Sequence, residues 1–143
     1  MKKIGIVFPG QGSQKVGMLV DIAQEYPAVR QVYQDASDIL GYDLWKLVSE
    51  GPAEELDKTA KTQPALLASS YALWQILFSH NKHKPALMAG HSLGEYSALT
   101  CAGALDFKDA LRIVATRGEL MQQAVPEGRG ALAAIVGLDD NTV

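Results

Sequence analysis

Hydrophobic residues occur along this chain in two kinds of run, short stretches that stop at glycine or proline and longer stretches with helical spacing. Ile4 to Phe8 stops at Pro9-Gly10 and predicts a buried parallel strand that leads into a glycine-rich loop. Ala86 to Ala89 predicts a second strand. Helices are predicted over 16–24, 29–40, 62–78, 95–102 and from 107 onward, with short elements at 44–49 and 51–56. The alternation indicates an α/β fold with a short parallel sheet flanked by helices.

Two of the predicted helices differ in how they should be buried. The stretch from Thr62 to Phe78 is apolar nearly all the way round, which predicts a helix that is covered on every side. In the helix that Asp106 should cap, the apolar positions fall on one face: Phe107, Ala110, Leu111, Val114 and Met121. On that helical wheel Arg112 lies opposite the apolar face and Arg117 lies on its flank. We therefore expect a solvated Arg112 and a half-buried Arg117 with a functional role.

The end of the chain carries an incomplete pattern. A further β-like run covers 131–136, and the segment after it, Asp139 to Asn141, is typical of the start of a helix. The sequence reaches Val143 before such a helix could form. We therefore expect the sequence to be truncated within a longer protein.

Composition excludes several classes of function. The 143 residues are 48% hydrophobic and 20% charged, which is ordinary for a globular domain with a real core. A net charge of −3 without any Lys/Arg run argues against nucleic acid as a partner. One cysteine and three scattered histidines form neither a disulfide framework nor a metal site. No run approaches the roughly 20 apolar residues of a membrane helix, and Ile4 to Phe8 is too short for a signal peptide. We expect a cytoplasmic protein that does not interact with membranes.

The segment Gly90-His91-Ser92-Leu93-Gly94 fits the G-x-S-x-G nucleophile elbow and lies between a predicted strand and a predicted helix, as that motif requires. Its glycines would allow a tight turn and close packing of helix against strand. Ser92 is therefore the candidate nucleophile, and the competing interpretation is a serine that caps the following helix. His91 should line the site without reaching the Ser92 hydroxyl, because adjacent residues in such a turn point in different directions.

Four segments together resemble the malonyl-CoA:acyl carrier protein transacylase family, within the acyltransferase domains of fatty acid and polyketide synthesis. They are Phe8-Pro9-Gly10-Gln11-Gly12-Ser13-Gln14, Thr62-Gln63-Pro64-Ala65, Gly90-His91-Ser92-Leu93-Gly94-Glu95-Tyr96, and Arg117-Gly118 followed by Met121-Gln122. The resemblance covers the whole chain and implies a hydrolase-like core. It assigns 1–125 to the N-terminal part of a large acyltransferase domain and 126–143 to the start of a small ferredoxin-like subdomain, so the chain would be about the first half of a family member.

The resemblance also implies a reaction in fatty acid biosynthesis. Ser92 would take a malonyl group from malonyl-CoA and pass it to the phosphopantetheine thiol of acyl carrier protein. The backbone N–H groups of Gln11 and Leu93 would form the oxyanion hole, and Arg117 would bind the malonyl carboxylate through its guanidinium fork. Coenzyme A enters only as the substrate thioester, with no tightly bound cofactor. Gln11 could instead belong to a simple βα turn, whereas a phosphate loop is disfavoured because no Gly-Lys-[Ser/Thr] follows.

Other interpretations stay open for the remaining residues. Gln63 lines the same cleft or caps a helix, and Arg117 could form an ordinary structural ion pair. His80 and His83 lie in a polar stretch and should be solvated, while Cys101 should be a small core residue. A serine hydrolase, such as a thioesterase or esterase, would use the same elbow, and a non-catalytic interaction module is a further alternative.

One feature of the family's pattern is absent from this sequence. In the family the base that activates the serine is a histidine well downstream of the elbow, and no histidine follows Ser92 here. We therefore expect a fragment whose C-terminal half, with the catalytic histidine, is supplied by the rest of the protein or by another chain. Such a piece by itself should expose apolar surface.

Overall fold

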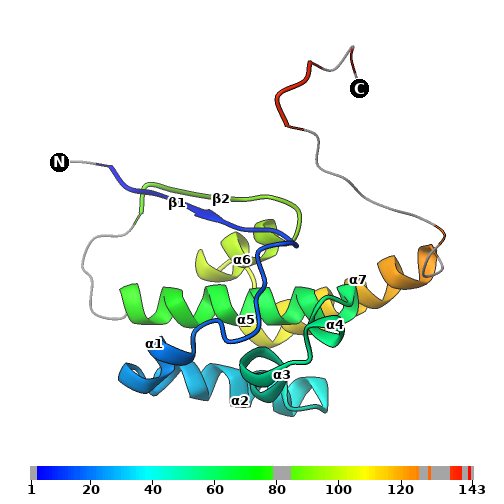
Figure 1. The fold of residues 1–143 in the computed structure, drawn as a ribbon. Coiled ribbons are helices and arrows are strands. Elements are labelled where there is room, and N and C mark those ends of the chain that lie inside the picture. The colour runs from blue at the N-terminus through cyan, green and yellow to red at the C-terminus, as the bar shows by residue number, and fades with distance from the viewer. Residues whose placement is uncertain (1–2, 79–84, 126–128, 130–135, 140–141, 143) are drawn as a thin grey trace.

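The computed structural model describes residues 3–78, 85–125, 129, 136–139 and 142. Its elements in chain order are β1 (Gly5–Phe8), α1 (Val20–Glu25), α2 (Ala28–Leu40), α3 (Leu44–Glu50), α4 (Ala53–Leu56), α5 (Thr59–Phe78), β2 (Leu87–Gly90), α6 (Leu93–Cys101) and α7 (Phe107–Ala124). Figure 1 shows the two strands side by side on α6, with α5 and α7 beneath α6 and with α2 on the far side of α5. The α/β fold with a short parallel sheet is confirmed.

The sheet consists of β1 and β2 in parallel, with Gly5 opposite Leu87 and Phe8 opposite Gly90. Phe8 is buried against α6, as expected for an inward-facing position. Side chains alternate between the faces of a strand, and on the opposite face Val7 and Leu87 are 79% and 60% exposed. The expectation of a buried first strand is therefore wrong for one face, because α6 covers only the other face of the sheet. The expected exposure of apolar surface is confirmed at the uncovered face.

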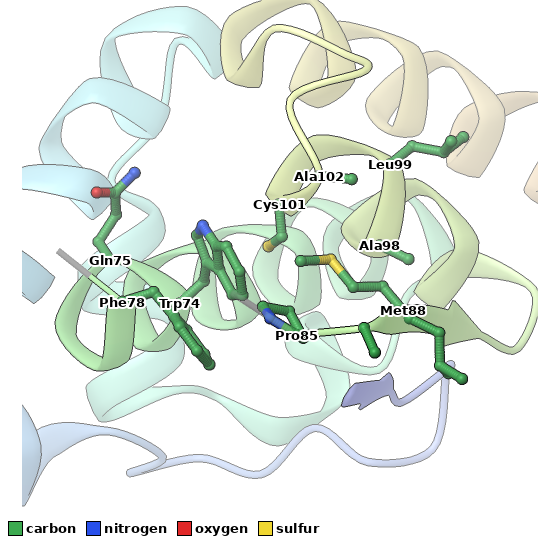
Figure 2. Close-up of a pocket in the computed structure, with 11 residues that line it drawn as sticks. Trp74, Gln75, Phe78, Pro85, Met88, Ala98, Leu99, Cys101 and Ala102 are labelled. Carbon is green, nitrogen blue, oxygen red and sulfur yellow. The ribbon is translucent and has the colours of Figure 1, made fainter. Parts of the chain in front are cut away.

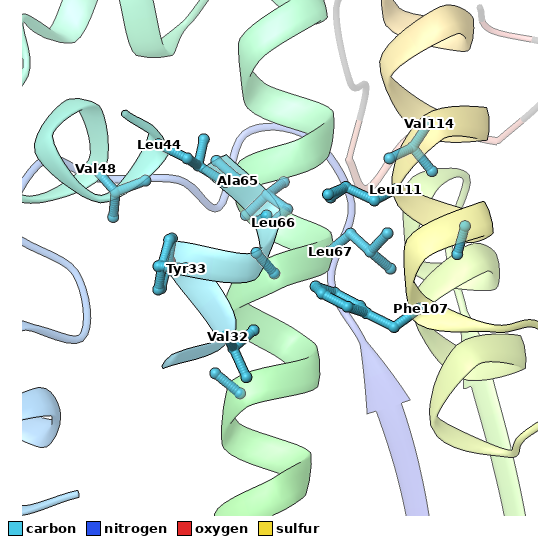
Figure 3. Close-up of a cluster of buried hydrophobic side chains, with 14 of the residues drawn as sticks. Val32, Tyr33, Leu44, Val48, Ala65, Leu66, Leu67, Phe107, Leu111 and Val114 are labelled. Carbon is cyan, nitrogen blue, oxygen red and sulfur yellow. The ribbon is translucent and has the colours of Figure 1, made fainter. Parts of the chain in front are cut away.

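Most of the core lies between helices, with α5 at its centre. Side chains of α5 and α7 point toward one another, as Figure 3 shows for Leu67 and Leu111, and Tyr33 of α2 belongs to the same cluster. The ring of Tyr71 on α5 stacks on that of Phe107 on α7 at a centroid distance of 4.3 Å. The prediction of a helix covered on every side is confirmed for 62–70, but it is wrong for the C-terminal part of α5, where Leu77 is 61% exposed. The helix also begins at Thr59, earlier than the expected Thr62.

Several predicted boundaries agree with the structure. Asp106 caps α7 by accepting hydrogen bonds from the backbone N–H groups of Lys108 and Asp109. Gly41 ends α2 in the left-handed conformation, with φ 74°. The first helix was expected from Val16 but begins at Val20, since Leu19 also adopts a left-handed φ of 63°. Among the described residues, no helix combines the length and the apolar character needed to cross a membrane.

Two sequence predictions lie outside the described residues. The β-like run is undescribed over 131–135, and so are His80 and His83. The interpretations given to these segments therefore stay predictions.

Candidate active site

The turn between β2 and α6 has the backbone of a strained elbow. Ser92 lies at φ 53° and ψ −108°, a conformation that L-residues rarely adopt. A Cβ atom on Gly90 would lie 1.9 Å from the carbonyl carbon of Gly94, and one on Gly94 would lie 2.2 Å from the carbonyl oxygen of Phe8. Any side chain at either glycine would therefore push the helix away from the strand. The sequence prediction about the role of these glycines is confirmed.

The Ser92 side chain makes no capping hydrogen bond to α6, although Ser92 occupies the position before the helix. Its Oγ instead accepts a hydrogen bond from Arg117 Nη2 at 3.0 Å. The interpretation of Ser92 as a helix cap is therefore wrong. An exposed hydroxyl on a strained turn, in contact with a guanidinium, is the arrangement expected of a nucleophile rather than of a cap.

Arg117 is half-buried on α7 and is held by three groups. Its Nη1 donates to Gln63 Oε1 at 2.7 Å, its Nη2 donates to Ser92, and its guanidinium lies 5.6 Å from the centre of the Tyr96 ring. In the part of the chain that the structure describes, no carboxylate lies within ion-pair distance of Arg117. The exposed Arg112, by contrast, pairs with Asp109 at 2.9 Å. The different environments predicted for the two arginines are confirmed.

Gln63 is fully buried within α5, and its side chain faces α7. Because α5 begins four residues before Gln63, the alternative of a cap residue is wrong. Its Oε1 accepts from Arg117, and its Nε2 donates to Met121 Sδ at 3.2 Å. Gln63 therefore contacts both Arg117 and Met121, which lie one helical turn apart on α7.

The close crossing of α5 and α7 is a part of the site that sequence reasoning missed. A Cβ atom on Gly118 would lie 2.7 Å from the carbonyl oxygen of Thr59 and 2.8 Å from Ala60 Cα. Gln122 Oε1 accepts a hydrogen bond from the backbone N–H of Ala60 at 3.3 Å, which satisfies a group in the first turn of α5. The available signal was the spacing of Arg117-Gly118 and Met121-Gln122, which places all four residues on one face of α7.

The loop after β1 is tied to the same end of α5. Gln11 Nε2 donates to Thr59 Oγ1 at 3.0 Å. Any Cβ on Gly10 would lie 2.9 Å from the carbonyl oxygen of His91, so this loop also touches the elbow. The backbone N–H groups of Gln11 and Leu93 have no acceptor among the described residues, and that of Leu93 is one of the N–H groups at a helix start that lack an intrahelical partner.

His91 belongs to the elbow and Cys101 ends α6, and neither hydrogen-bonds to the Ser92 hydroxyl among the described residues. The His91 ring packs against Gly10, where a Cβ atom would lie 3.2 Å from Nδ1. Across the described ranges, His91 makes no hydrogen bond to Ser92. Cys101 is 6% exposed, and burial raises the pKa of its thiol to about 12. The prediction of Cys101 as a core residue is confirmed.

An apolar groove of about 530 Å³ lies at the C-terminal end of α6, away from this set of residues. Figure 2 shows Trp74 and Phe78 of α5, Met88 of β2 and Cys101 of α6 around it. None of Ser92, Arg117, Gln63 and Gln11 lines the groove.

A model of the acyl transferase domain family matches residues 6–142 of the chain. The chain belongs to this family. It is 63% identical to the malonyl CoA-acyl carrier protein transacylase of Haemophilus influenzae and 59% identical to that of Escherichia coli K12. Both matches cover 100% of this chain but 46% of the relative, so the chain spans about half the length of these proteins.

Solved structures of acyl transferases confirm the fold. An acyl carrier protein S-malonyltransferase from Vibrio cholerae aligns with a TM-score of 0.91 at 58% identity, over 98% of this chain and 46% of that one. The enzyme from Xanthomonas oryzae aligns with a TM-score of 0.93 at 46% identity, over 99% and 45%. A malonyl-transacylase in complex with a type II polyketide synthase acyl carrier protein aligns with a TM-score of 0.86 at 61% identity. The alignment covers 89% of this chain and 41% of that one. The family resemblance expected from the sequence is therefore confirmed.

Proposed function

We propose that the protein containing this chain transfers malonyl groups from malonyl-CoA to the phosphopantetheine thiol of acyl carrier protein. The observation that carries the proposal is Arg117, a half-buried guanidinium without a carboxylate partner among the described residues, in contact with the elbow serine. A guanidinium fork binds a carboxylate through two parallel hydrogen bonds, and malonyl is a thioester acyl group that carries one. A simple esterase has no use for such a cation beside its nucleophile.

The first half-reaction forms an ester at Ser92. Its Oγ attacks the thioester carbonyl carbon, the hydroxyl proton passes to a base, and the carbonyl oxygen becomes an oxyanion. The N–H groups of Gln11 and Leu93 donate hydrogen bonds to that oxyanion. Each donor lowers the activation barrier by roughly 3 kcal/mol. The C–S bond then breaks, and coenzyme A leaves as a thiol after taking up the proton.

The second half-reaction reverses these steps with a different thiol. The phosphopantetheine thiol of acyl carrier protein gives its proton to the base and attacks the malonyl-serine carbonyl, and Ser92 is released with its proton restored. A site that serves two large thiols in turn gives ping-pong kinetics. The base is the downstream histidine of the family pattern, which we assign to the part of the protein beyond this chain, together with the remainder of the ferredoxin-like subdomain that begins within 126–143.

Acyl carrier protein is the proposed partner, and the complex of a relative with such a carrier supports this assignment. We further propose that the reaction takes place in the cytoplasm and that no tightly bound cofactor takes part. In this proposal Gln63 orients Arg117, and His91 lines the site where it packs against Gly10.

Intact mass spectrometry of the full-length protein tests the proposal. Incubation with malonyl-CoA should add the mass of one malonyl group, the adduct should be absent from the Ser92→Ala variant, and added holo acyl carrier protein should remove it. Absence of an adduct on the full-length wild type, or an adduct that persists in Ser92→Ala, would contradict the mechanism. Loss of the malonyl group to water in preference to the carrier would identify a serine hydrolase instead.

A further inference from the structure

Met121 lies one turn after Arg117 on α7, and both contact Gln63. We propose that Met121 is a positioning residue for carboxylated substrates: its sulfur fixes the side-chain amide of Gln63, which in turn holds the guanidinium of Arg117 beside Ser92. This inference rests on the proposed function, because it concerns how the carboxylate-binding cation is held.

The orientation of the Gln63 amide follows from the two groups it faces. Arg117 can only donate hydrogen bonds, so the group that meets Nη1 must be Oε1. The amide NH₂ then points to the opposite side, where Met121 Sδ accepts at 3.2 Å. A thioether only accepts, so the two neighbours require the same amide orientation.

The hydrogen bond to the Met121 sulfur matters for the orientation of Gln63 because the amide is buried. Gln63 is 0% exposed beneath a Met121 side chain that is itself 46% exposed, and a leucine at 121 would keep most of that cover without offering the NH₂ group an acceptor. A buried amide donor without an acceptor costs free energy, which rotation of the side chain would relieve. Rotation would take Oε1 away from Arg117 and release the guanidinium toward its other neighbours, Ser92 and Tyr96.

The backbone around this chain of contacts is fixed by close packing. Gly118 touches Thr59 and Ala60, so α7 cannot move toward α5 to compensate for a lost side-chain contact. The position of Arg117 therefore depends on side-chain hydrogen bonds more than on helix position.

The test compares two substitutions of Met121 in the full-length protein. Met121→Leu keeps the volume and removes the acceptor, while Met121→Gln keeps an unbranched chain and supplies a carbonyl oxygen. Transfer rates are measured with malonyl-CoA and with acetyl-CoA, which lacks the carboxylate. We expect Met121→Leu to raise KM for malonyl-CoA and to lower the malonyl-to-acetyl ratio of kcat/KM by about fivefold. Met121→Gln should restore most of that ratio.

Met88→Leu is the matched control, because Met88 is a half-buried methionine of the groove whose sulfur accepts no hydrogen bond within the described ranges. It should leave the ratio unchanged. Equal losses with both substrates in Met121→Leu, or no loss at all, would overturn the proposal.

A crystal structure of full-length Met121→Leu gives a second readout that does not depend on activity. Loss of the hydrogen bond between Gln63 Oε1 and Arg117 Nη1 supports the proposal, and a retained bond overturns it. If the wild type transfers no malonyl group, the proposed function fails, while the structure of the variant still decides whether Met121 positions Gln63 and Arg117.

Discussion

Arg117 Nη2 donates a hydrogen bond to Ser92 Oγ at 3.0 Å and so joins two residues that lie 25 positions apart. The bond engages a lone pair of the hydroxyl oxygen and leaves its proton free to be donated. Each Nη atom carries two N–H groups, and the bonds to Gln63 and Ser92 use one of each. Under the proposed function, the remaining N–H groups of the same guanidinium are available to a malonyl carboxylate beside the nucleophile.

Substitution of Arg117 should separate charge from geometry. We expect Arg117→Ala to lower kcat/KM for malonyl-CoA by about 100-fold, since two charge-assisted hydrogen bonds are lost. Arg117→Lys should recover little of this loss, because an ammonium cannot pair with a carboxylate as a fork. Steady-state kinetics measures both variants. Arg112→Ala, which removes an exposed arginine of the same helix, is the control and should match the wild type. Malonyl transfer that survives Arg117→Ala would contradict the assigned role.

The strained backbone of Ser92 should make its glycine variant more stable than its alanine variant. Its φ of 53° strains any L-residue, and glycine adopts such a conformation without a steric penalty. We expect Ser92→Gly to be more stable than Ser92→Ala by about 1 kcal/mol, as measured by urea unfolding. Both variants should be unable to form the malonyl adduct. A less stable Ser92→Gly would show that the elbow is relaxed in solution.

Gly118→Ala should destabilise the fold, although glycine-to-alanine changes in an open helix usually stabilise it. The new methyl group would lie 2.7 Å from the carbonyl oxygen of Thr59, so α5 and α7 must separate. We expect a loss of about 2 kcal/mol in the free energy of unfolding, together with slower malonyl transfer. Thr116→Ala changes an exposed position of the same helix and should leave stability within about 0.5 kcal/mol. A neutral Gly118→Ala would exclude the tight crossing.

The Cys101 thiol should resist alkylation while the protein is folded. The thiolate is the reactive form, and burial raises the pKa of Cys101 from 9.0 to about 12. We expect iodoacetamide to label Cys101 at pH 8 at least roughly 100-fold faster in urea than in buffer. Rapid labelling of the folded protein would contradict a buried thiol.

The same raised pKa affects stability at alkaline pH. Below pH 9 both the folded and the unfolded protein keep the Cys101 proton, so the contribution to stability is fully present. Between pH 9 and 12 the unfolded state loses that proton first, which favours unfolding. We expect the urea midpoint to fall more steeply between pH 8 and pH 10 in the wild type than in Cys101→Ala. Burial also raises the pKa of Tyr42, to about 12, so the variant should keep part of the slope. Equal slopes in both proteins would contradict the raised thiol pKa.

Local patterns in the sequence were sufficient to predict several parts of the site. The elbow follows from two glycines around Ser92, because steric limits on a tight turn act over a few residues. The cap at Asp106 and the flank position of Arg117 follow from helix geometry, which repeats at a fixed angle for each residue. These features need no information about distant parts of the chain.

The contacts of those residues were decided only by the tertiary structure. Helical periodicity placed Arg117 on a flank, but the crossing of α5 over α7 brought Gln63, 54 positions away, within hydrogen-bond distance. The same crossing gave Gly118 its role and made the sulfur of Met121 an acceptor for a buried amide. The expectation of a buried first strand was wrong for a related reason, since a strand sequence rich in apolar residues does not specify how many layers cover it. Periodicity determines the direction of a side chain relative to its own helix or strand, and packing determines what that side chain meets.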